Sequence, residues 1–496
     1  MALEESDDLQ KKIAEFKTRR EFLKEGTLGL GSMALSMLLG GSGGVAGEED
    51  VQKALNERMQ EPHFAPQAKH VIFLQMTGGP SQLELFDYKP VLAENDGKPT
   101  PESVMKGDNF AFIQGRPQLM GPRANFDRHG DCGAWVSDHL PHFQNVVDDV
   151  SFLKAVQTDE FNHAPAQLLM LTGSPRPGRP SMGSWATYGL GSENENLPGF
   201  VALLSGGSKP DAGKNAWGSG FMPSVHEGVQ CRQEGDPILF VENPDGLPRD
   251  VRKQQMEALE RLNEKNAEEF GDEQTLSRVE QYELAYKMQM SVPEVMDISR
   301  EPKRIQQMYG ANPGGKSFSN NCLLARRLVE KGVRFVNLFH WGWDQHSKLD
   351  KDLTSRCNEV DRPMTALIQD LKQRGLLDET LIVWGGEFGR TPMLENRGGE
   401  IPDNPGRDHH NSAYTMWMAG GGVKGGFTHG ETDELGYAPV EGSVHVHDIQ
   451  ATILNQLGFD HEEFTYRHQG RDFRLTDVHG HVIDEILEKN PNPNMV

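Results

Sequence analysis

The sequence predicts an α/β protein of three layers, α/β/α, in which a mainly parallel sheet lies between helices. Short apolar runs of strand length alternate with amphipathic stretches of helix length, most clearly over residues 316–390. Strands that alternate with helices pair in parallel and place helices on both faces of the sheet. Each apolar run also ends at glycines or polar residues, where the chain turns.

Residues 1–46 are predicted to form a twin-arginine signal segment. Arg19 and Arg20 precede a weakly apolar, glycine-rich run over residues 26–46 that ends in small residues. A basic helix end followed by a linker is the alternative. We expect the twin-arginine translocase to carry the folded protein to the periplasm or out of the cell. Export in the folded state suits a protein that takes up its cofactor first.

One α/β domain is expected over residues 65–490. Residues 88–150 are rich in proline, glycine and charge, which indicates a long loop over the site, and residues around 200–310 are expected to be largely an insertion. The predicted core strands are 70–76, 150–156, 333–339, 381–384 and 414–419, and the predicted helices are 318–331, 363–374 and 449–457. Residues 251–290 are charged and periodic, as in amphipathic helices.

Composition excludes several classes of function. The formal net charge of -23 over 496 residues makes nucleic acid and acidic membrane surfaces poor partners. The four cysteines are too far apart for a zinc ribbon or a CxxC redox motif. Beyond the signal segment, no run approaches the roughly 18 apolar residues that a membrane span needs.

Metal-capable side chains follow the predicted strands. Asp344 and His346 come after the strand at 333–339, and Glu387 comes after the strand at 381–384. Three more side chains of this kind stand in a row before the last strand, namely Asp408, His409 and His410. In open α/β sheets, ligands bind beyond the carboxyl ends of the strands. Carboxylates with imidazoles suit zinc, manganese or iron. A buried network that only orders loops is the alternative.

Three other residues are candidates for chemistry. Ser81 follows the first strand, where it is a nucleophile, an anion-binding hydroxyl or a helix cap. His163 begins an apolar helix at the predicted carboxyl edge of the sheet, where it is a catalytic group or a metal ligand, with a helix cap or a core histidine as the structural alternative. Arg390 follows Glu387 closely and is either an anion clamp or half of a surface ion pair.

A longer set of motifs identifies a family. The motifs are Gly78-Gly79-Pro80-Ser81, Phe86-Asp87, Asn162-His163 through Thr172-Gly173, Trp343-Asp344-Gln345-His346, Gly386 to Pro392, Gly406 to His410, His447-Asp448 and Gly470-Arg471-Asp472. Together they resemble, over nearly the whole mature chain, the secreted proteins of the family called domain of unknown function 1501. That family is placed in the alkaline phosphatase and sulfatase superfamily.

The resemblance implies a mixed, mainly parallel sheet that binds divalent metals at its carboxyl edge. Members of the superfamily transfer phosphoryl or sulfuryl groups through a hydroxyl-type nucleophile. The implied metal site consists of Asp344, His346 and one of His409 or His410, and Glu387 takes the position that serves a second metal. The ion is expected to be zinc, calcium, magnesium or manganese.

The chain departs from the superfamily pattern at three places. Thr77 and Gly78 stand where an acidic residue usually follows the first strand, and Phe388 stands where a His or Asn ligand often follows the acid. His163 occupies the nucleophile position, and Gln167 occupies that of the usual Arg. Because no cysteine is there to become formylglycine, an ordinary sulfatase mechanism is excluded.

We therefore expect an exported, metal-dependent hydrolase that acts on a phosphate or sulfate ester of a small molecule or a glycan. His163 would be a covalent acceptor or a general acid/base, Ser81 the alternative nucleophile and Arg390 an anion clamp. The alternative function is a non-catalytic, metal-bound protein that binds acidic or sulfated glycans. A structural role in a larger exported system is a third hypothesis.

Overall fold

The computed structural model describes residues 61–105, 110–194, 196–231, 292–397 and 403–495. The chain divides into two compact units, and the larger one consists of Met59–Glu242 and Leu284–Val496. The other unit, the predicted signal segment and the predicted helices at 251–290 lie outside the described residues. Within the described ranges, no helix has the length and apolar character needed to cross a membrane.

A mixed, mainly parallel sheet forms the centre of the larger unit. In spatial order its strands are β12 (Phe427–His429), β4 (Ser151–Gln157), β11 (Tyr414–Ala419), β8 (Thr380–Gly385), β1 (His70–Thr77), β7 (Phe335–Trp341), β5 (Phe200–Ser205) and β6 (Val229–Cys231), with β15 (Val444–His445) beside β4. β11 is antiparallel to β4 and β8, and the other pairs are parallel. β1, β4, β7 and β8 therefore end at the same edge, and the predicted fold class is confirmed.

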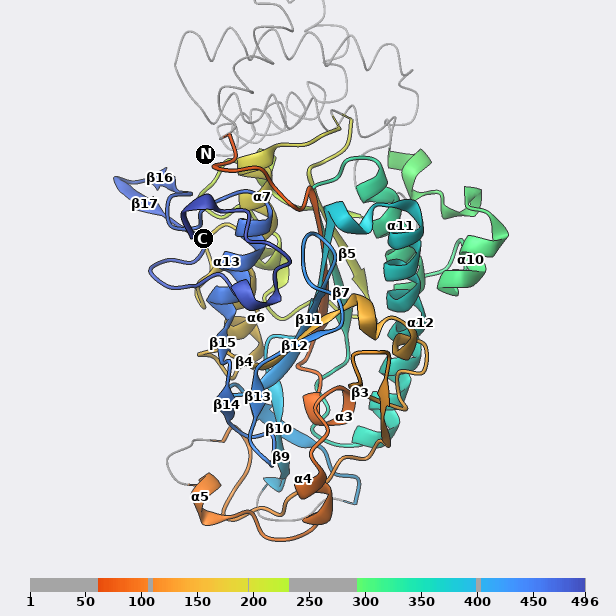
Figure 1. Ribbon diagram of the computed structural model, residues 1–496, viewed down its shortest axis with the longest axis vertical. Helices are drawn as coiled ribbons and strands as arrows, with labels where there is room; N and C mark the ends of the chain where they lie inside the picture. Colours follow the sequence, from red (N-terminus) through yellow and green to blue (C-terminus); the bar gives the residue numbers. More distant parts are fainter. Residues whose placement is uncertain (1–60, 106–109, 195, 232–291, 398–402, 496) are drawn as a thin grey trace, which may run out of the picture. The chain divides into compact units, whose positions relative to one another are not determined.

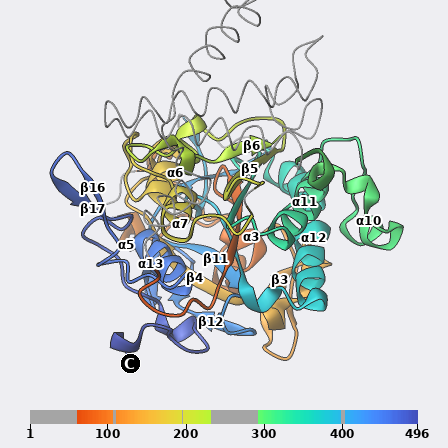
Figure 2. The same ribbon diagram turned by 90° about the horizontal axis from the view of Figure 1, so that it is seen from above.

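Helices cover both faces of the sheet (Figures 1 and 2). One face carries α6 (His163–Thr172), α7 (Met182–Leu190) and α13 (Val446–Gln456), and the other carries α11 (Phe318–Glu330) and α12 (Leu349–Arg374). The smaller helices include α3 (Gln82–Leu85), α4 (Pro90–Glu94), α5 (Glu102–Met105) and α10 (Lys303–Tyr309). Antiparallel strand pairs lie outside the main sheet: β2 (Phe126–His129) with β3 (Ala134–Ser137), β9 (Gly389–Leu394) with β10 (Arg407–His410), β13 (Glu431–Thr432) with β14 (Pro439–Glu441), and β16 (Tyr466–His468) with β17 (Arg471–Phe473).

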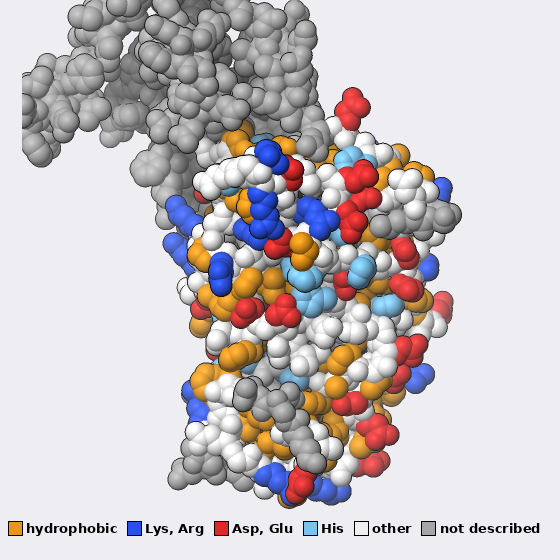
Figure 3. All heavy atoms as spheres, turned by 90° about the vertical axis from the view of Figure 1, so that its left-hand side faces the viewer, with side chains coloured by type: hydrophobic (Ala, Val, Ile, Leu, Met, Phe, Trp, Pro, Cys, Tyr) orange, Lys and Arg blue, Asp and Glu red, His pale blue; other side chains and the backbone are white. Residues whose placement is uncertain are grey.

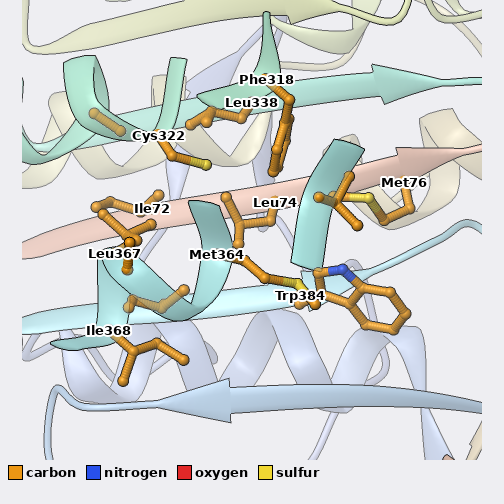
Figure 4. Packing of buried hydrophobic residues seen from close by; sticks show 14 of the residues in the cluster. Ile72, Leu74, Met76, Phe318, Cys322, Leu338, Met364, Leu367, Ile368 and Trp384 are labelled. Atoms are coloured by element: carbon orange, nitrogen blue, oxygen red, sulfur yellow. The ribbon is translucent and has the colours of Figure 1, made fainter. Parts of the chain in front are cut away.

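The alternation of side chains along β1 divides the core into two halves. Ile72, Leu74 and Met76 pack with residues of α11 and α12 (Figure 4), whereas Val71 and Phe73 belong to the apolar cluster on the side of α6, α7 and α13. All of these β1 side chains are completely buried. Successive side chains of a strand point to opposite faces, so a continuous apolar run fits a strand covered on both sides.

Two elements differ from the prediction. α12 begins at Leu349 and contains Pro363, where the sequence predicted a helix start. Proline inside a helix costs about 3 kcal/mol, but burying a leucine gains about 1.5–3 kcal/mol. Leu349 and Leu353 are both buried ahead of the proline, which offsets its cost. Residues 200–231, expected to open an insertion, instead contribute β5 and β6 to the sheet.

Candidate metal centre

The site is built where β7, β1 and β8 end side by side. Gly78 follows β1 with a φ of 116°, and a side chain there would collide with the backbone of Trp343 and Asp344. The backbone N–H of Gly78 donates to Glu387 Oε1 at 3.0 Å. The glycine at position 78 therefore lets the segments that carry Asp344 and Glu387 come close together.

Three imidazoles converge on one carboxylate oxygen. Asp344 Oδ1 lies 2.8 Å from His346 Nε2, 3.2 Å from His409 Nε2 and 3.4 Å from His163 Nε2. The ligand atoms of these four residues all lie within 4.8 Å of one another. Three imidazoles and one carboxylate are a donor set that divalent zinc or manganese accepts. We call this group the histidine cluster.

In each of the three imidazoles, Nδ1 faces away from Asp344 and contacts a hydrogen-bond acceptor outside the cluster. His163 Nδ1 lies 2.8 Å from Glu387 Oε1, His409 Nδ1 lies 2.8 Å from the carbonyl oxygen of Phe161, and His346 Nδ1 contacts Glu395 Oε2. When Nδ1–H donates outwards, the lone pair of Nε2 points inwards, which is the usual arrangement around metal-bound histidines. The rings are therefore oriented as ligands.

The ionisation of the cluster follows from its crowding. Burial disfavours a charged imidazole, but the hydrogen bonds to Asp344 and Glu387 outweigh it and raise the pKa of His163 to about 9. The pKa of His346 is also raised against the effect of burial, by Asp344 and Glu395, whereas burial lowers the pKa of His409. Burial opposes ionisation of Asp344, yet the three rings and Arg390 lower its pKa. The cluster thus holds a proton that a cation would displace.

Glu387 is a completely buried carboxylate behind the cluster. Its Oε1 accepts from Gly78, His163 and Gln167, with Gln167 Nε2 at 3.0 Å. Burial would raise the pKa of Glu387, but His163 and Gln167 outweigh it and lower the pKa. Its Oε2 atom is buried without a hydrogen-bond partner among the described residues. Glu387 therefore orients His163 and stands behind the cluster.

Arg390 is almost fully buried, and its donors are directed at the protein. Its Nε donates to the carbonyl of Gly79 at 2.9 Å and its Nη1 to that of Arg407 at 3.0 Å. Its Nη2 contacts the carbonyl of Gly78 and lies 2.7 Å from Asp344 Oδ1. This geometry favours holding the site together over clamping a substrate anion.

The other predicted residues lie around the cluster. His410 points to the opposite side of β10 from His409, and its ring stacks on Tyr437. Asp408 is buried and accepts from the backbone N–H groups of Phe112 and Ile113 at 2.7 and 3.0 Å. It also forms a second three-residue group with His346 and Glu395.

Ser81 precedes α3 and is completely buried, and its hydroxyl has no hydrogen-bond partner among the described residues. Sequence reasoning did not select Glu395, although it directly follows β9 and the strand-end rule applies to it. It preferred His163 as a nucleophile or general acid/base and left a ligand role open, and the geometry groups this ring with the metal-capable side chains.

Other histidines gather near the start of α13. The rings of His445 and His447 lie 5.0 Å apart, those of His447 and His479 lie 5.1 Å apart, and His445 Nε2 lies 3.4 Å from Asp159 Oδ2. The side of the molecule that carries α13 and β15 shows histidines close to carboxylates (Figure 3). These rings are not among the groups that could hold a metal ion in the described ranges.

Comparison with known proteins now identifies the family. The family described as "Protein of unknown function (DUF1501)" matches residues 68–487. The chain belongs to this family. The match includes every residue of the histidine cluster. A search of the curated proteins found no match.

Solved structures that resemble this DUF1501 protein include a sulfatase from Pseudoalteromonas sp., with 13% identity over 89% of this chain and 75% of that chain and a TM-score of 0.37. The lipoteichoic acid synthase LtaP from Listeria monocytogenes shows 10% identity over 80% of this chain and 74% of that one, with a TM-score of 0.37. A mutant of the TAB5 alkaline phosphatase with magnesium bound shows 11% identity over 72% of this chain and 92% of that one, with a TM-score of 0.29.

Proposed function

We propose that this DUF1501 protein is a metal-dependent hydrolase of phosphate or sulfate esters, with His163, Asp344, His346 and His409 as the metal ligands. The observation that supports it is the convergence of three Nε2 atoms on Asp344 Oδ1, with each Nδ1 held from behind. A divalent ion bound there would polarise an ester oxygen and lower the pKa of a bound water.

The remaining residues of the site would position these ligands. Glu387 keeps the Nδ1 proton of His163 pointed away from the cluster, and Glu395 does the same for His346. Arg390 ties the turn after β1 to Asp344. In this proposal His163 is a ligand instead of the nucleophile, and the buried hydroxyl of Ser81 takes no part in catalysis.

His409 and His410 provide a matched pair of variants, because they are neighbours on β10 and face opposite sides. After purification with zinc or manganese, His409→Ala should contain less than a tenth of the wild-type metal, whereas His410→Ala should keep it. Turnover of an aryl phosphate and an aryl sulfate should fall with the metal. Equal metal content in the His409→Ala variant and the wild type would refute the proposed ligand set. Full metal content without turnover of either ester would refute the hydrolase.

We also propose export by the twin-arginine translocase, since Arg19 and Arg20 precede the predicted apolar run. Replacing both with lysine should retain the protein in the cytoplasm, as measured by cell fractionation. Replacing Lys11 and Lys12 with arginine is the control, because it keeps the charge and leaves the motif intact. Finding the double-lysine variant in the periplasm at the wild-type level would rule this route out.

A further inference from the structure

Aromatic side chains are exposed close to the histidine cluster. Among the described residues the large exposed hydrophobic side chains are Phe112, Phe161, Trp341, Val440 and Val478, at 37%, 41%, 42%, 62% and 70% of full exposure. Phe161 lies two residues before His163, and Trp341 lies three residues before Asp344. Single exposed hydrophobic residues are ordinary, but a group of them at one site marks a binding surface.

Phe112 is fixed against the cluster even though it is exposed. Its ring meets those of His346 and His409 edge-on, with centroids 5.0 and 5.8 Å apart. Its backbone N–H donates to Asp408, which also accepts from the backbone N–H of His409 at 2.8 Å. The guanidinium of Arg397 lies 3.9 Å from the centroid of the Phe112 ring. The ring therefore borders the histidine cluster, and Arg397 lies over it.

Phe161 is fixed by its backbone. Its carbonyl oxygen accepts from His409 Nδ1 at 2.8 Å, so the residue cannot move far without turning a proposed ligand. The residues beside it in the sequence are polar, since Asp159 and Glu160 precede it and Asn162 follows it, and Asp159 and Asn162 are exposed. Phe161 thus presents a rigid apolar face among hydrogen-bonding groups.

This combination suits one class of ligand. A fatty chain or an aryl group needs apolar walls that enclose most of its surface. Here the exposed residues next to the two rings in the sequence, Asp159, Asn162 and Gln114, are polar. The guanidinium of Arg397 lies over the Phe112 ring. A sugar ring has an apolar C–H face that packs on an aromatic face, and hydroxyls at its edge that bond to carboxylates and amides.

We infer that Phe112 and Phe161 bind the sugar ring of a glycan whose ester group lies at the histidine cluster. The inference rests on the proposed function for the place of the ester, and on the two aromatic rings for the sugar. The substrate class is therefore a sugar phosphate or sulfate in a glycan, in preference to an ester of a lipid or a simple aryl alcohol.

The test is calorimetric titration of the full-length, zinc-loaded protein with oligosaccharides of galactose, glucose and fucose, each neutral and sulfated. Phe161→Ala should weaken binding by about 5- to 10-fold, the usual worth of an aromatic packing contact. Phe161→Tyr should restore it, and Val478→Ala, which removes an exposed side chain from a segment without cluster residues, should change nothing. Phe112→Ala should act similarly. Zinc content and melting temperature serve as folding controls for every variant.

Two outcomes would overturn the inference. One is that the wild type binds none of the oligosaccharides, or that both alanine variants bind them as tightly as the wild type. The other is that only a naphthyl sulfate binds in a manner that depends on Phe161, which would indicate an apolar leaving group. Failure of the proposed hydrolase function would look different. The protein would still bind the oligosaccharides in a manner that depends on Phe161, but it would hydrolyse no ester.

Discussion

Glu387 has the most constrained charge in the candidate metal centre. Its carboxylate is fully buried, and one oxygen accepts three hydrogen bonds, including that from His163. A buried carboxylate remains ionised only when donors and a positive partner offset the loss of water. The raised pKa of His163 and the lowered pKa of Glu387 express the same pairing. Removing that charge should alter the basicity of the His163 ring with little change in shape.

Replacing Glu387 with glutamine tests this role. We expect the affinity for zinc to fall by about 10- to 100-fold, the usual effect of losing an outer partner of a metal-bound histidine. A competition titration against a zinc chelator measures it. Glu379→Gln, which removes half of an exposed pair with Lys69, should leave the affinity unchanged. Unchanged affinity in the Glu387→Gln variant would show that this carboxylate does not act on the ligands.

The choice between His409 and His410 shows where sequence reasoning stops at this scale. Both follow Asp408 in one motif, and both are histidines, so either could bind a metal. Successive residues of a strand face opposite sides, so only one of them can face the cluster. Which one depends on the pairing of β10 with β9, where His409 lies opposite Arg390. A short hairpin outside the main sheet gives no periodic signal that would fix this register.

At the scale of elements, buried ion pairs join α11 and α12. Arg326 of α11 is 1% exposed and lies 2.7 Å from Glu301 and 3.0 Å from Asp370 of α12. Arg327 also pairs with Glu301, which lies just after a short 3-10 turn at Ile298–Arg300. The network holds the helix layer that covers one face of the sheet. Breaking a buried pair is costly because it leaves an uncompensated charge.

Glu301→Gln should therefore lower the free energy of unfolding by about 1.5–3 kcal/mol at pH 7, because both arginines lose a charged acceptor while Arg326 keeps Asp370 and Glu330. Burial opposes ionisation of Glu301, but Arg326 and Arg327 outweigh it and lower its pKa. A lowered carboxyl pKa stabilises the fold above the unfolded value of about 4.3, and this stabilisation is lost as the pH falls through the folded value. The difference between wild type and variant in urea unfolding should thus shrink below about pH 4.

The control for this experiment is Glu294→Gln, because Glu294 and Arg300 form an exposed pair at 3.1 Å. It should change the free energy of unfolding by less than about 1 kcal/mol. If Glu301→Gln is as stable as this control, the network contributes no stability.

The elements themselves were largely predictable, for a physical reason. Continuous apolar runs reveal β1, β7, β8 and β11, because strands covered on both faces need apolar side chains throughout. An amphipathic pattern reveals α11, because a helix buried on one face needs apolar side chains only there. α12 was predicted only in its second half, since Pro363 resembles a helix start and the burial that extends the helix depends on contacts distant in the sequence. Glu395 was missed because β9 belongs to a two-stranded sheet with β10, apart from the main sheet.

At the scale of the whole molecule, the proposed ligands come from distant parts of the chain. His163 begins α6, Asp344 and His346 follow β7, and His409 lies on β10. The strand-end rule predicted that Asp344, His346, Glu387 and one of the two later histidines would converge. The structure brings Asp344, His346 and His409 together, whereas Glu387 contacts the cluster through His163 Nδ1. The sequence left a ligand role and a catalytic role for His163 both open, because the choice depends on the orientation of the ring. An ion bound to all four residues would cross-link segments that unfolding separates.

Metal binding should therefore raise the stability of the whole unit. A ligand that binds only the folded state at 100 times its dissociation constant adds about 2.7 kcal/mol, which for a chain of this size is an increase of about 3 °C in melting temperature. Zinc added to chelator-treated protein should produce this rise, and a chelator should reverse it. The response should weaken at lower pH, because protons compete for the imidazoles. His410→Ala should respond like the wild type, and His409→Ala should not. A zinc response that is equal in both variants would mean that the ion binds elsewhere.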